Sequence, residues 1–195
     1  SAASDVYKRQ YRAAGINHLT WFTDMKIDGK DVYPKLHDKL KESGFDKKEP
    51  ISKQLYDIYG LYPAPGDRHV GEFFPYYMKE EVLMEQDYEW KNNAFKVVDG
   101  WREEARVLFD EVRTKKEGYE EFLKGSGETA TYFIRSLATG DISDEMVNVI
   151  NNGYIDNVSS GIIVELPTYI DEFGLHPQKI GKLPDAIAAQ CDRLG

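Results

Sequence analysis

Two neighbouring polar residues, Asn17 and His18, lie inside an apolar, β-prone stretch that runs from residue 15 to residue 23. A buried amide or imidazole without a hydrogen-bond partner destabilises a fold by about 1–3 kcal/mol, so a chain that needs only a core gains nothing from this pair. A neutral imidazole ligates divalent metal ions, and an amide hydrogen-bonds hydroxyl groups. The pair therefore predicts a bound ligand or ion. The alternative for His18 is a core histidine bonded to a backbone carbonyl.

A second polar stretch, residues 66–77, places four ionisable groups beside aromatic side chains: Asp67, Arg68, His69 and Glu72. The prolines and glycine of residues 63–66 exclude a continuous helix, so this stretch is expected on a loop that leads into a helical turn. Loops of this kind often carry function. The structural alternative for Asp67 is a capping role at a helix that begins near Val70. The alternative for Arg68 is a solvated side chain paired with Glu72 at i, i+4.

The elements that must position these residues can be placed from the sequence. Residues 16–27 are predicted to form one strand, closed by a tight turn at Asp28 and Gly29 with a hairpin or strand corner after it. Asp31 is expected to cap a helix that has Pro34 in its first turn and ends before Gly44. A second short helix is expected over residues 52–59.

The second half of the chain combines helices with short strands. Residues 90–124 show an apolar residue at each helical turn, which predicts a long amphipathic helix. A further helix is expected from about residue 130 to Gly140, and a last one over residues 185–194. The runs 146–150, 161–166 and 168–171 predict an antiparallel meander. The fold class is therefore α+β, with helices packed on a small, mainly antiparallel sheet.

Composition and charge limit the function classes. The 195 residues suffice for one well-buried domain. The 34 acidic and 25 basic residues give a net charge of −9, which argues against nucleic-acid and anionic-membrane partners. No apolar run approaches the roughly 20 residues of a membrane helix, and no signal peptide is visible. The one cysteine, Cys191, cannot form an internal disulfide, so we expect a cytoplasmic protein with a buried thiol.

The first ten residues are treated separately. Residues 4–10 resemble the translated adapter sequence found at the ends of assembled metagenomic reading frames, so residues 1–10 are left out of the fold prediction. The native sequence is then expected to begin near Tyr11, in a fragment whose natural protein starts well upstream. No Gly-x-Gly-x-x-Gly motif follows a predicted strand, so tight NAD binding by this chain alone is not expected.

Several motifs in the right order make the chain similar to glycoside hydrolase family 4. They are Gly-Ile-Asn-His at residues 15–18, Asp-Arg-His at 67–69, the Asn-Asn-Gly-Tyr-Ile turn at 151–155, Val-Glu-Leu-Pro at 164–167, and residues 174–177 leading to 181–184. That family contains NAD- and divalent-metal-dependent α-glucosidases, α-galactosidases, α-galacturonidases and 6-phosphoglycosidases. The resemblance covers residues 11–195. It implies a domain like the C-terminal domain of lactate and malate dehydrogenases, with a Rossmann domain missing upstream.

The resemblance also implies roles for the first polar pair. His18 matches the histidine that ligates a divalent metal, commonly Mn²⁺, together with a cysteine that would lie upstream of this chain. A neutral imidazole suits such an ion. Asn17 would hydrogen-bond a sugar hydroxyl or orient the oxygen on the metal. The cofactors implied are NAD and Mn²⁺ or another divalent metal.

The second polar stretch is assigned to substrate and base. Asp67 is the predicted catalytic base, because the α-glucosidase branch of the family has an aspartate in this neighbourhood. The 6-phosphoglycosidases place a tyrosine nearby, which keeps Tyr76 and Tyr77 as alternatives. Arg68 and His69 are predicted to bind substrate hydroxyls or a uronate carboxylate, the arginine through a two-pronged contact.

In the reaction that the resemblance implies, NAD oxidises the sugar at C3, and the resulting ketone acidifies the hydrogen on C2. A base removes that proton and the leaving group departs, while the metal stabilises the negative charge that develops. Water then adds, and the reduced cofactor reduces the ketone again. This departs from the two-carboxylate scheme of most glycosidases. The substrate would be a small α-glycoside or oligosaccharide, and the protein a dimer or tetramer. This fragment alone is expected to be inactive. Two alternatives stay open: a 2-hydroxyacid dehydrogenase domain, in which His18 shuttles a proton, and a non-catalytic assembly module.

Overall fold

The computed structural model describes residues 9–42, 49–79, 89–115, 120 and 129–195. The chain divides into two units, residues 1–75 together with 132–195, and residues 76–131. The first unit contains Asn17, His18 and residues 67–69. Within the described residues, no helix combines the length and the apolarity needed to cross a membrane.

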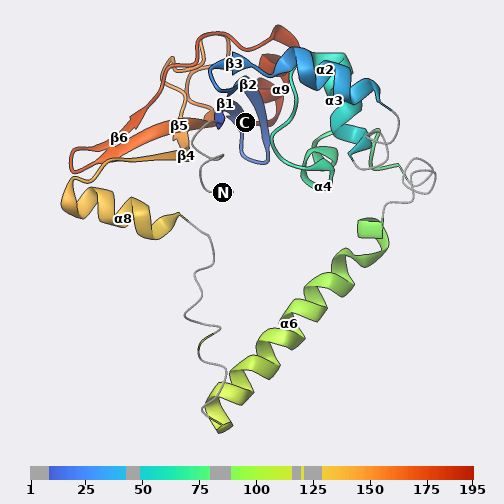
Figure 1. Cartoon of the computed structure of the whole chain (residues 1–195), viewed down its shortest axis with the longest axis vertical. Coiled ribbons are helices and arrows are strands. Elements are labelled where there is room, and N and C mark those ends of the chain that lie inside the picture. The colour runs from blue at the N-terminus through green and yellow to red at the C-terminus, as the bar shows by residue number, and fades with distance from the viewer. Residues whose placement is uncertain (1–8, 43–48, 80–88, 116–119, 121–128) are drawn as a thin grey trace. The chain divides into compact units, whose positions relative to one another are not determined.

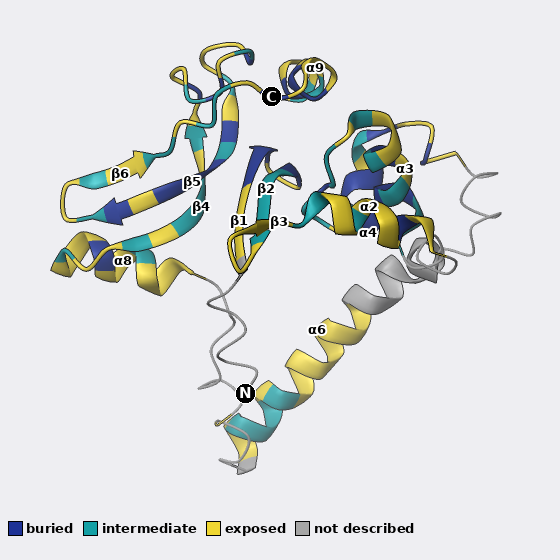
Figure 2. Ribbon diagram, turned by 45° about the horizontal axis from the view of Figure 1, so that its top comes forward, coloured by how far each residue is buried: buried dark blue, intermediate teal, exposed yellow. Residues whose placement is uncertain are grey.

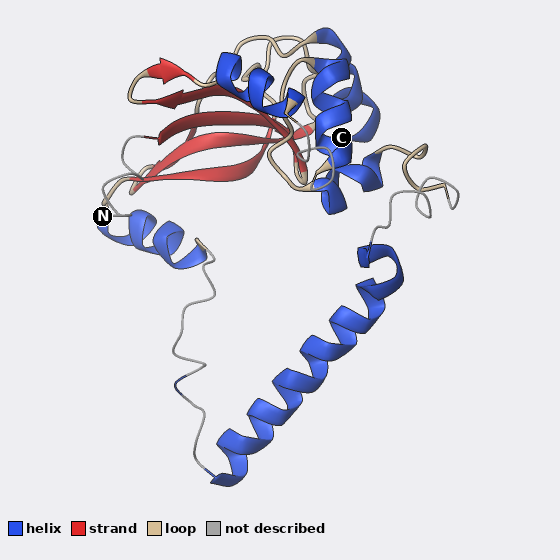
Figure 3. Cartoon of the chain, turned by 45° about the vertical axis from the view of Figure 1, so that its right-hand side comes forward, coloured by secondary structure: helices blue, strands red, loops and turns tan. Residues whose placement is uncertain are grey.

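The first unit is built on an antiparallel sheet, drawn in Figure 1 and, coloured by secondary structure, in Figure 3. The described strands follow the order β3-β2-β1-β5-β4, and β6 pairs with β5. Their bounds are β1 Arg9–Ile16, β2 Leu19–Ile27, β3 Lys30–Asp31, β4 Ser143–Ile150, β5 Ile163–Asp171 and β6 Gly174–Pro177. The predicted α+β class and the antiparallel sheet are confirmed.

Helices lie against both ends of this sheet (Figures 1 and 3). Those of the first unit are α2 Tyr33–Lys41, α3 Pro50–Tyr59, α4 Asp67–Val70, the 3₁₀ turn η1 Gly71–Phe73, α9 Asp185–Leu194 and, from residue 132 on, α8 Ala130–Thr139. Local sequence signals determine both ends of α3, because Pro50 occupies its first position and Gly60 ends it in the left-handed conformation. Ile51 and Leu55, one helical turn apart, bury its apolar face. The predicted helices at 52–59 and 185–194 are confirmed.

The core lies between the sheet and these helices, where Figure 2 shows the buried residues in dark blue. Trp21 from β2, Leu166 from β5 and Ile187 from α9 are fully buried. The Trp21 ring packs against Tyr59 with centroids 5.2 Å apart, which joins the end of α3 to the sheet. This packing fixes the positions of β1, β2 and the loop before α4 relative to one another.

The strand predicted over residues 16–27 is interrupted. β1 ends at Ile16 and β2 begins at Leu19, so Asn17 and His18 form the two-residue turn of an antiparallel hairpin. The turn predicted at Asp28 and Gly29 is confirmed, and both residues have positive φ, 51° and 73°. Apolar residues flank positions 17 and 18 on both sides, so the hydrophobic pattern of the sequence did not reveal the turn at these two positions.

Two further boundaries differ from the predictions. Arg9 and Gln10, which the sequence analysis left out, pair with β2 at Ile27 and Lys26. β5 continues through Pro167, which pairs with Met146, so the two strands predicted at 161–166 and 168–171 are one. The register of β4 holds the strand together across the proline.

Two helix predictions can be compared with the described residues. The predicted cap by Asp31 is wrong by one position: α2 begins at Tyr33 and Val32 is its N-cap residue, while Asp31, one residue earlier, accepts a hydrogen bond from the Tyr33 backbone N–H at 2.9 Å. Gly44, the predicted stop of that helix, lies outside the described residues. In the second unit, α6 runs over Glu89–Lys115, and the predicted continuation to residue 124 lies almost entirely outside the described residues.

Candidate functional site

The turn between β1 and β2 presents Asn17 and His18 at the surface, and both side chains are exposed. The expectation that they lie buried in a strand is therefore wrong, because the turn carries them out of the apolar run. His18 has a φ of 62°, a left-handed conformation that costs a residue with a Cβ about 1–2 kcal/mol. Backbone strain of this kind concentrates at functional sites. A glycine or asparagine would make the same turn with less strain.

Gly15 makes this turn possible. A Cβ at that position would stand 2.4 Å from the backbone oxygen of Leu19, on the opposite strand of the hairpin. Only a glycine therefore allows β1 and β2 to approach this closely. The Gly-x-Asn-His spacing thus serves a mechanical purpose: the glycine closes the hairpin and the next residues project the amide and the imidazole.

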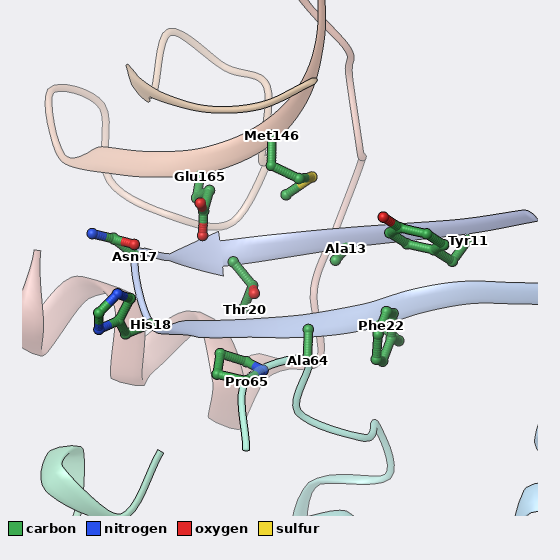
Figure 4. A pocket seen from close by; sticks show the side chains of 10 residues that line it. All are labelled: Tyr11, Ala13, Asn17, His18, Thr20, Phe22, Ala64, Pro65, Met146 and Glu165. Carbon is green, nitrogen blue, oxygen red and sulfur yellow. The ribbon is translucent and has the colours of Figure 1, made fainter. Parts of the chain in front are cut away.

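A pocket of about 460 Å³ opens beside the turn, within the usual size range of small-molecule sites. Figure 4 shows its lining side chains, which come from β1, β2, β4, β5 and the loop before α4. Asn17, His18 and Thr20 lie at one end together with Glu165. The remaining lining residues are Tyr11, Ala13, Phe22, Ala64, Pro65 and Met146. The pocket therefore has an apolar and aromatic wall and a polar end, as small-molecule sites commonly have.

Glu165 is the acidic residue of the pocket lining, and the sequence alone did not indicate it as a site residue. β1 and β5 are paired at Gly15 and Glu165, which brings this carboxylate next to the turn although 150 positions separate the two residues. Its side chain is half-buried, and burial raises its pKa while His18 opposes that rise. Across the described part of the chain, no hydrogen bond or ion pair engages the Glu165 carboxylate. The Val-Glu-Leu-Pro motif pointed to this strand but not to a site.

His69 lies against His18 from α4. The two imidazole rings have centroids 4.5 Å apart at an interplanar angle of 57°. The structure therefore brings together two of the predicted site residues from the separate polar stretches. Arg68, by contrast, is exposed and does not line the pocket.

Asp67 is buried, with 6% of its surface exposed, and its carboxylate caps helix α3. The carboxylate accepts hydrogen bonds from the backbone N–H groups of Ile51 and Ser52, at 2.8 and 2.7 Å, and from Ser52 Oγ at 2.6 Å. The backbone N–H of Asp67 in turn donates to Glu49 Oε2 at 2.9 Å. Burial, reinforced by the neighbouring Asp67 carboxylate, raises the pKa of Glu49.

This arrangement is the capping role that the sequence allowed for Asp67, but at a different helix. The helix that contains Asp67 begins at that residue and not near Val70, and the side chain serves α3 instead. Asp67 does not line the pocket. The catalytic role stays a prediction. The alternative bases, Tyr76 and Tyr77, belong to the second unit, where their rings contact each other with centroids 4.5 Å apart.

The described residues supply only part of a metal coordination sphere. No group of three or more His, Cys, Asp or Glu side chains in the described ranges is arranged to hold an ion. His18 offers one exposed imidazole, which fits a divalent cation as a single ligand. Cys191 offers none, because it is fully buried in α9 and burial raises the pKa of its thiol to about 11.

The first unit is thus an α+β domain with a pocket of about 460 Å³ beside an exposed histidine. The chain belongs to family 4 of the glycosyl hydrolases, because the model of that family's C-terminal domain matches residues 13–194. This confirms the resemblance predicted from the motifs.

Two curated proteins with similar sequences support this family assignment. The chain is 32% identical over 194 residues to an α-galacturonidase of Thermoanaerobacterium saccharolyticum, covering 89% of this chain and 40% of the relative. It is 29% identical over 185 residues to an α-galactosidase of Bacillus subtilis, covering 91% of this chain and 41% of the relative. The chain thus spans about two fifths of the length of the curated relatives it matches.

Solved structures show the same fold. A putative glucosidase from Bacillus subtilis superposes with a TM-score of 0.78 at 25% identity, over 96% of this chain and 45% of that one. A 6-phospho-β-glucosidase from Thermotoga maritima, determined with manganese, NAD⁺ and glucose-6-phosphate, superposes with a TM-score of 0.62 at 23% identity, over 94% of this chain and 42% of that one.

Proposed function

We propose that the protein carrying this domain hydrolyses α-glycosidic bonds of a galactose-type sugar and depends on NAD and a divalent metal, Mn²⁺ among the candidates. Family membership supports glycosidic chemistry over the alternative of a 2-hydroxyacid dehydrogenase. The names of the relatives, α-galactosidase and α-galacturonidase, support the sugar. The solved structure with manganese and NAD⁺ supports the cofactors.

The observation that carries the proposal is the placement of His18. Its imidazole is exposed at the polar end of a sugar-sized pocket, on a turn held in a strained conformation and closed by Gly15. A histidine that served only the core would be buried and would hydrogen-bond a backbone group. An exposed imidazole beside an amide and a carboxylate is instead available to a ligand.

When bound, NAD would supply a transient oxidation of the sugar, and the metal would stabilise negative charge on the adjacent oxygens. In this proposal His18 supplies one ligand to the metal through a neutral ring nitrogen. Asn17 donates a hydrogen bond to a hydroxyl of the sugar, and His69 holds the His18 ring in place by packing against it. The apolar wall of the pocket excludes water from one face of the sugar.

The proposal assigns no base. The three hydrogen bonds that the Asp67 carboxylate accepts favour its structural role, since a base at that position would first have to leave the N-terminus of α3. Arg68, exposed and outside the pocket lining, is proposed to meet substrate only where it extends beyond the enclosed sugar. We also propose that the 195-residue chain alone is inactive, and that the whole protein forms a dimer or tetramer.

The test uses the full-length protein with NAD, Mn²⁺ and a reductant, screened against aryl α-galactosides, α-glucosides and α-uronides. We expect turnover that stops when NAD and the metal are removed, and that resumes when both are restored. His18→Ala should abolish the response to Mn²⁺. His37→Ala is the matched control, because His37 is exposed on α2 and does not line the pocket. Turnover that persists without NAD and metal would contradict the proposal.

A further inference from the structure

The Glu165 carboxylate lies at the same polar end of the pocket as His18 (Figure 4). The pairing of Glu165 with Gly15 brings β5 to the base of the hairpin turn that carries His18. The Glu165 side chain is half-buried, so its charge has lost part of its hydration. Within the described residues, no hydrogen bond or ion pair replaces that hydration. Because partly buried charges are normally paired, this carboxylate lacks a partner that the fold does not supply.

The described pocket lining contains no lysine or arginine that could pair with Glu165. His18 is the basic side chain of that lining, and it opposes the rise in the pKa of Glu165 that burial causes. An imidazole that ligates a metal must be neutral, however, so His18 in that role brings no positive charge of its own. The charge that remains available to pair with Glu165 is that of the metal ion itself.

A divalent metal on His18 has a matching need for negative charge. His18 is one neutral ligand, and the described residues contain no group of three or more His, Cys, Asp or Glu side chains arranged around an ion. Carboxylate oxygens suit Mn²⁺, and acidic groups just outside a coordination sphere also raise the affinity of a site. The unpaired carboxylate and the incomplete metal site therefore lie at the same end of one pocket and complement each other in charge.

We propose that Glu165 is a metal-site residue, whose carboxylate pairs its negative charge with the divalent cation that His18 ligates. This rests on the proposed function, which places the cation on His18, and it adds a residue from β5 to that site. The role depends on charge more than on shape. A neutral side chain of the same size should therefore fold equally well and hold the cation less tightly.

Glu165→Gln tests the inference, because glutamine keeps the size of the side chain and removes its charge. The full-length protein is freed of metal with a chelator and titrated with Mn²⁺ in the absence of substrate. The electron paramagnetic resonance signal of the free ion then gives the dissociation constant. We expect that constant to rise about 10–100-fold, the usual effect of removing a side chain that supports a metal ligand. Glu165→Asp, which keeps the charge, should bind Mn²⁺ more tightly than Glu165→Gln does.

The melting temperature of the metal-free protein separates this role from a structural one. In Glu165→Gln it should stay the same or rise, because the variant removes a partly desolvated charge. Weaker Mn²⁺ binding together with a lower metal-free melting temperature would indicate a structural role and overturn the inference. Glu172→Gln is the matched control, because Glu172 is an exposed glutamate that follows β5 and does not line the pocket. It should leave both values unchanged.

The outcomes separate the inference from the proposed function. If the wild-type protein cleaves α-glycosides and Glu165→Gln binds Mn²⁺ as tightly as the wild type does, the inference is wrong and the function stands. If the wild-type protein binds Mn²⁺ and cleaves no α-glycoside, the function is wrong and the dissociation constants of the variants still decide the inference. A wild-type protein that binds no Mn²⁺ overturns the inference.

Discussion

Replacing Asp67 by alanine should destabilise the fold, because this carboxylate caps helix α3. It accepts hydrogen bonds from the backbone N–H groups of Ile51 and Ser52 and from Ser52 Oγ, in a site that is 6% exposed. A hydrogen bond to a charged group contributes about 1.5–3 kcal/mol, and a helix cap about 1 kcal/mol. These contributions overlap, and water can reach part of the gap, so the expected loss for Asp67→Ala is about 3 kcal/mol.

Thermal and denaturant unfolding measure this loss. For a chain of this size, about 3 kcal/mol corresponds to a fall in melting temperature of roughly 6–12 °C. Asp57→Ala is the control on the same helix. That carboxylate is exposed and, among the described residues, pairs with Lys53 at 2.7 Å, so its removal should change stability by less than about 0.5 kcal/mol.

The same variant separates the two roles considered for Asp67. A capping residue lowers stability, whereas a base that contributes nothing to the fold lowers kcat and leaves the melting temperature unchanged. Asp67→Ala with wild-type stability and a large loss of kcat would refute the structural reasoning and restore the predicted base.

Three further predictions concern the turn and the lone thiol. Gly15→Ala should lose about 3 kcal/mol in denaturant unfolding, because its Cβ would meet backbone, whereas Gly29→Ala, with open space around it, should lose about 1 kcal/mol; equal losses would contradict the close approach. His18→Gly should stay within about 1 kcal/mol of wild-type stability, since glycine tolerates the left-handed turn, yet lose Mn²⁺-dependent turnover. Cys191, with a pKa raised to about 11, should be protonated at pH 8 and unreactive towards a disulfide reagent until the protein unfolds; rapid labelling of the native protein at pH 8 would argue against burial.

Much of the fold follows from local sequence signals. Pro50 and Gly60 mark the ends of α3, and the Asp-Gly pair at residues 28 and 29 specifies a turn with two positive φ angles. These signals act within a few residues of the backbone they control, so they can be recognised without knowledge of the tertiary structure.

The incorrect strand predictions concern segments whose local sequence pattern is compatible with two different secondary structures. An apolar run over residues 16–27 fits one long strand or two strands joined by a turn, and only the pairing of β1 with β2 selects the second. Pro167 suggested a break between two strands, but the continuous register with β4 carries β5 through it. In both cases the deciding contacts come from another strand.

The sequence by itself determined the family and the identities of the candidate metal ligand and its neighbouring amide, because the Gly-x-Asn-His motif combines a turn-forming glycine with a ligating side chain. Only the tertiary structure decided which charged residues share a site. It directed Asp67 to the N-terminus of α3 and brought Glu165 to the pocket. The physical reason is that strand pairing and helix capping join residues distant in sequence, here 150 positions apart for Gly15 and Glu165, and no local pattern encodes that separation.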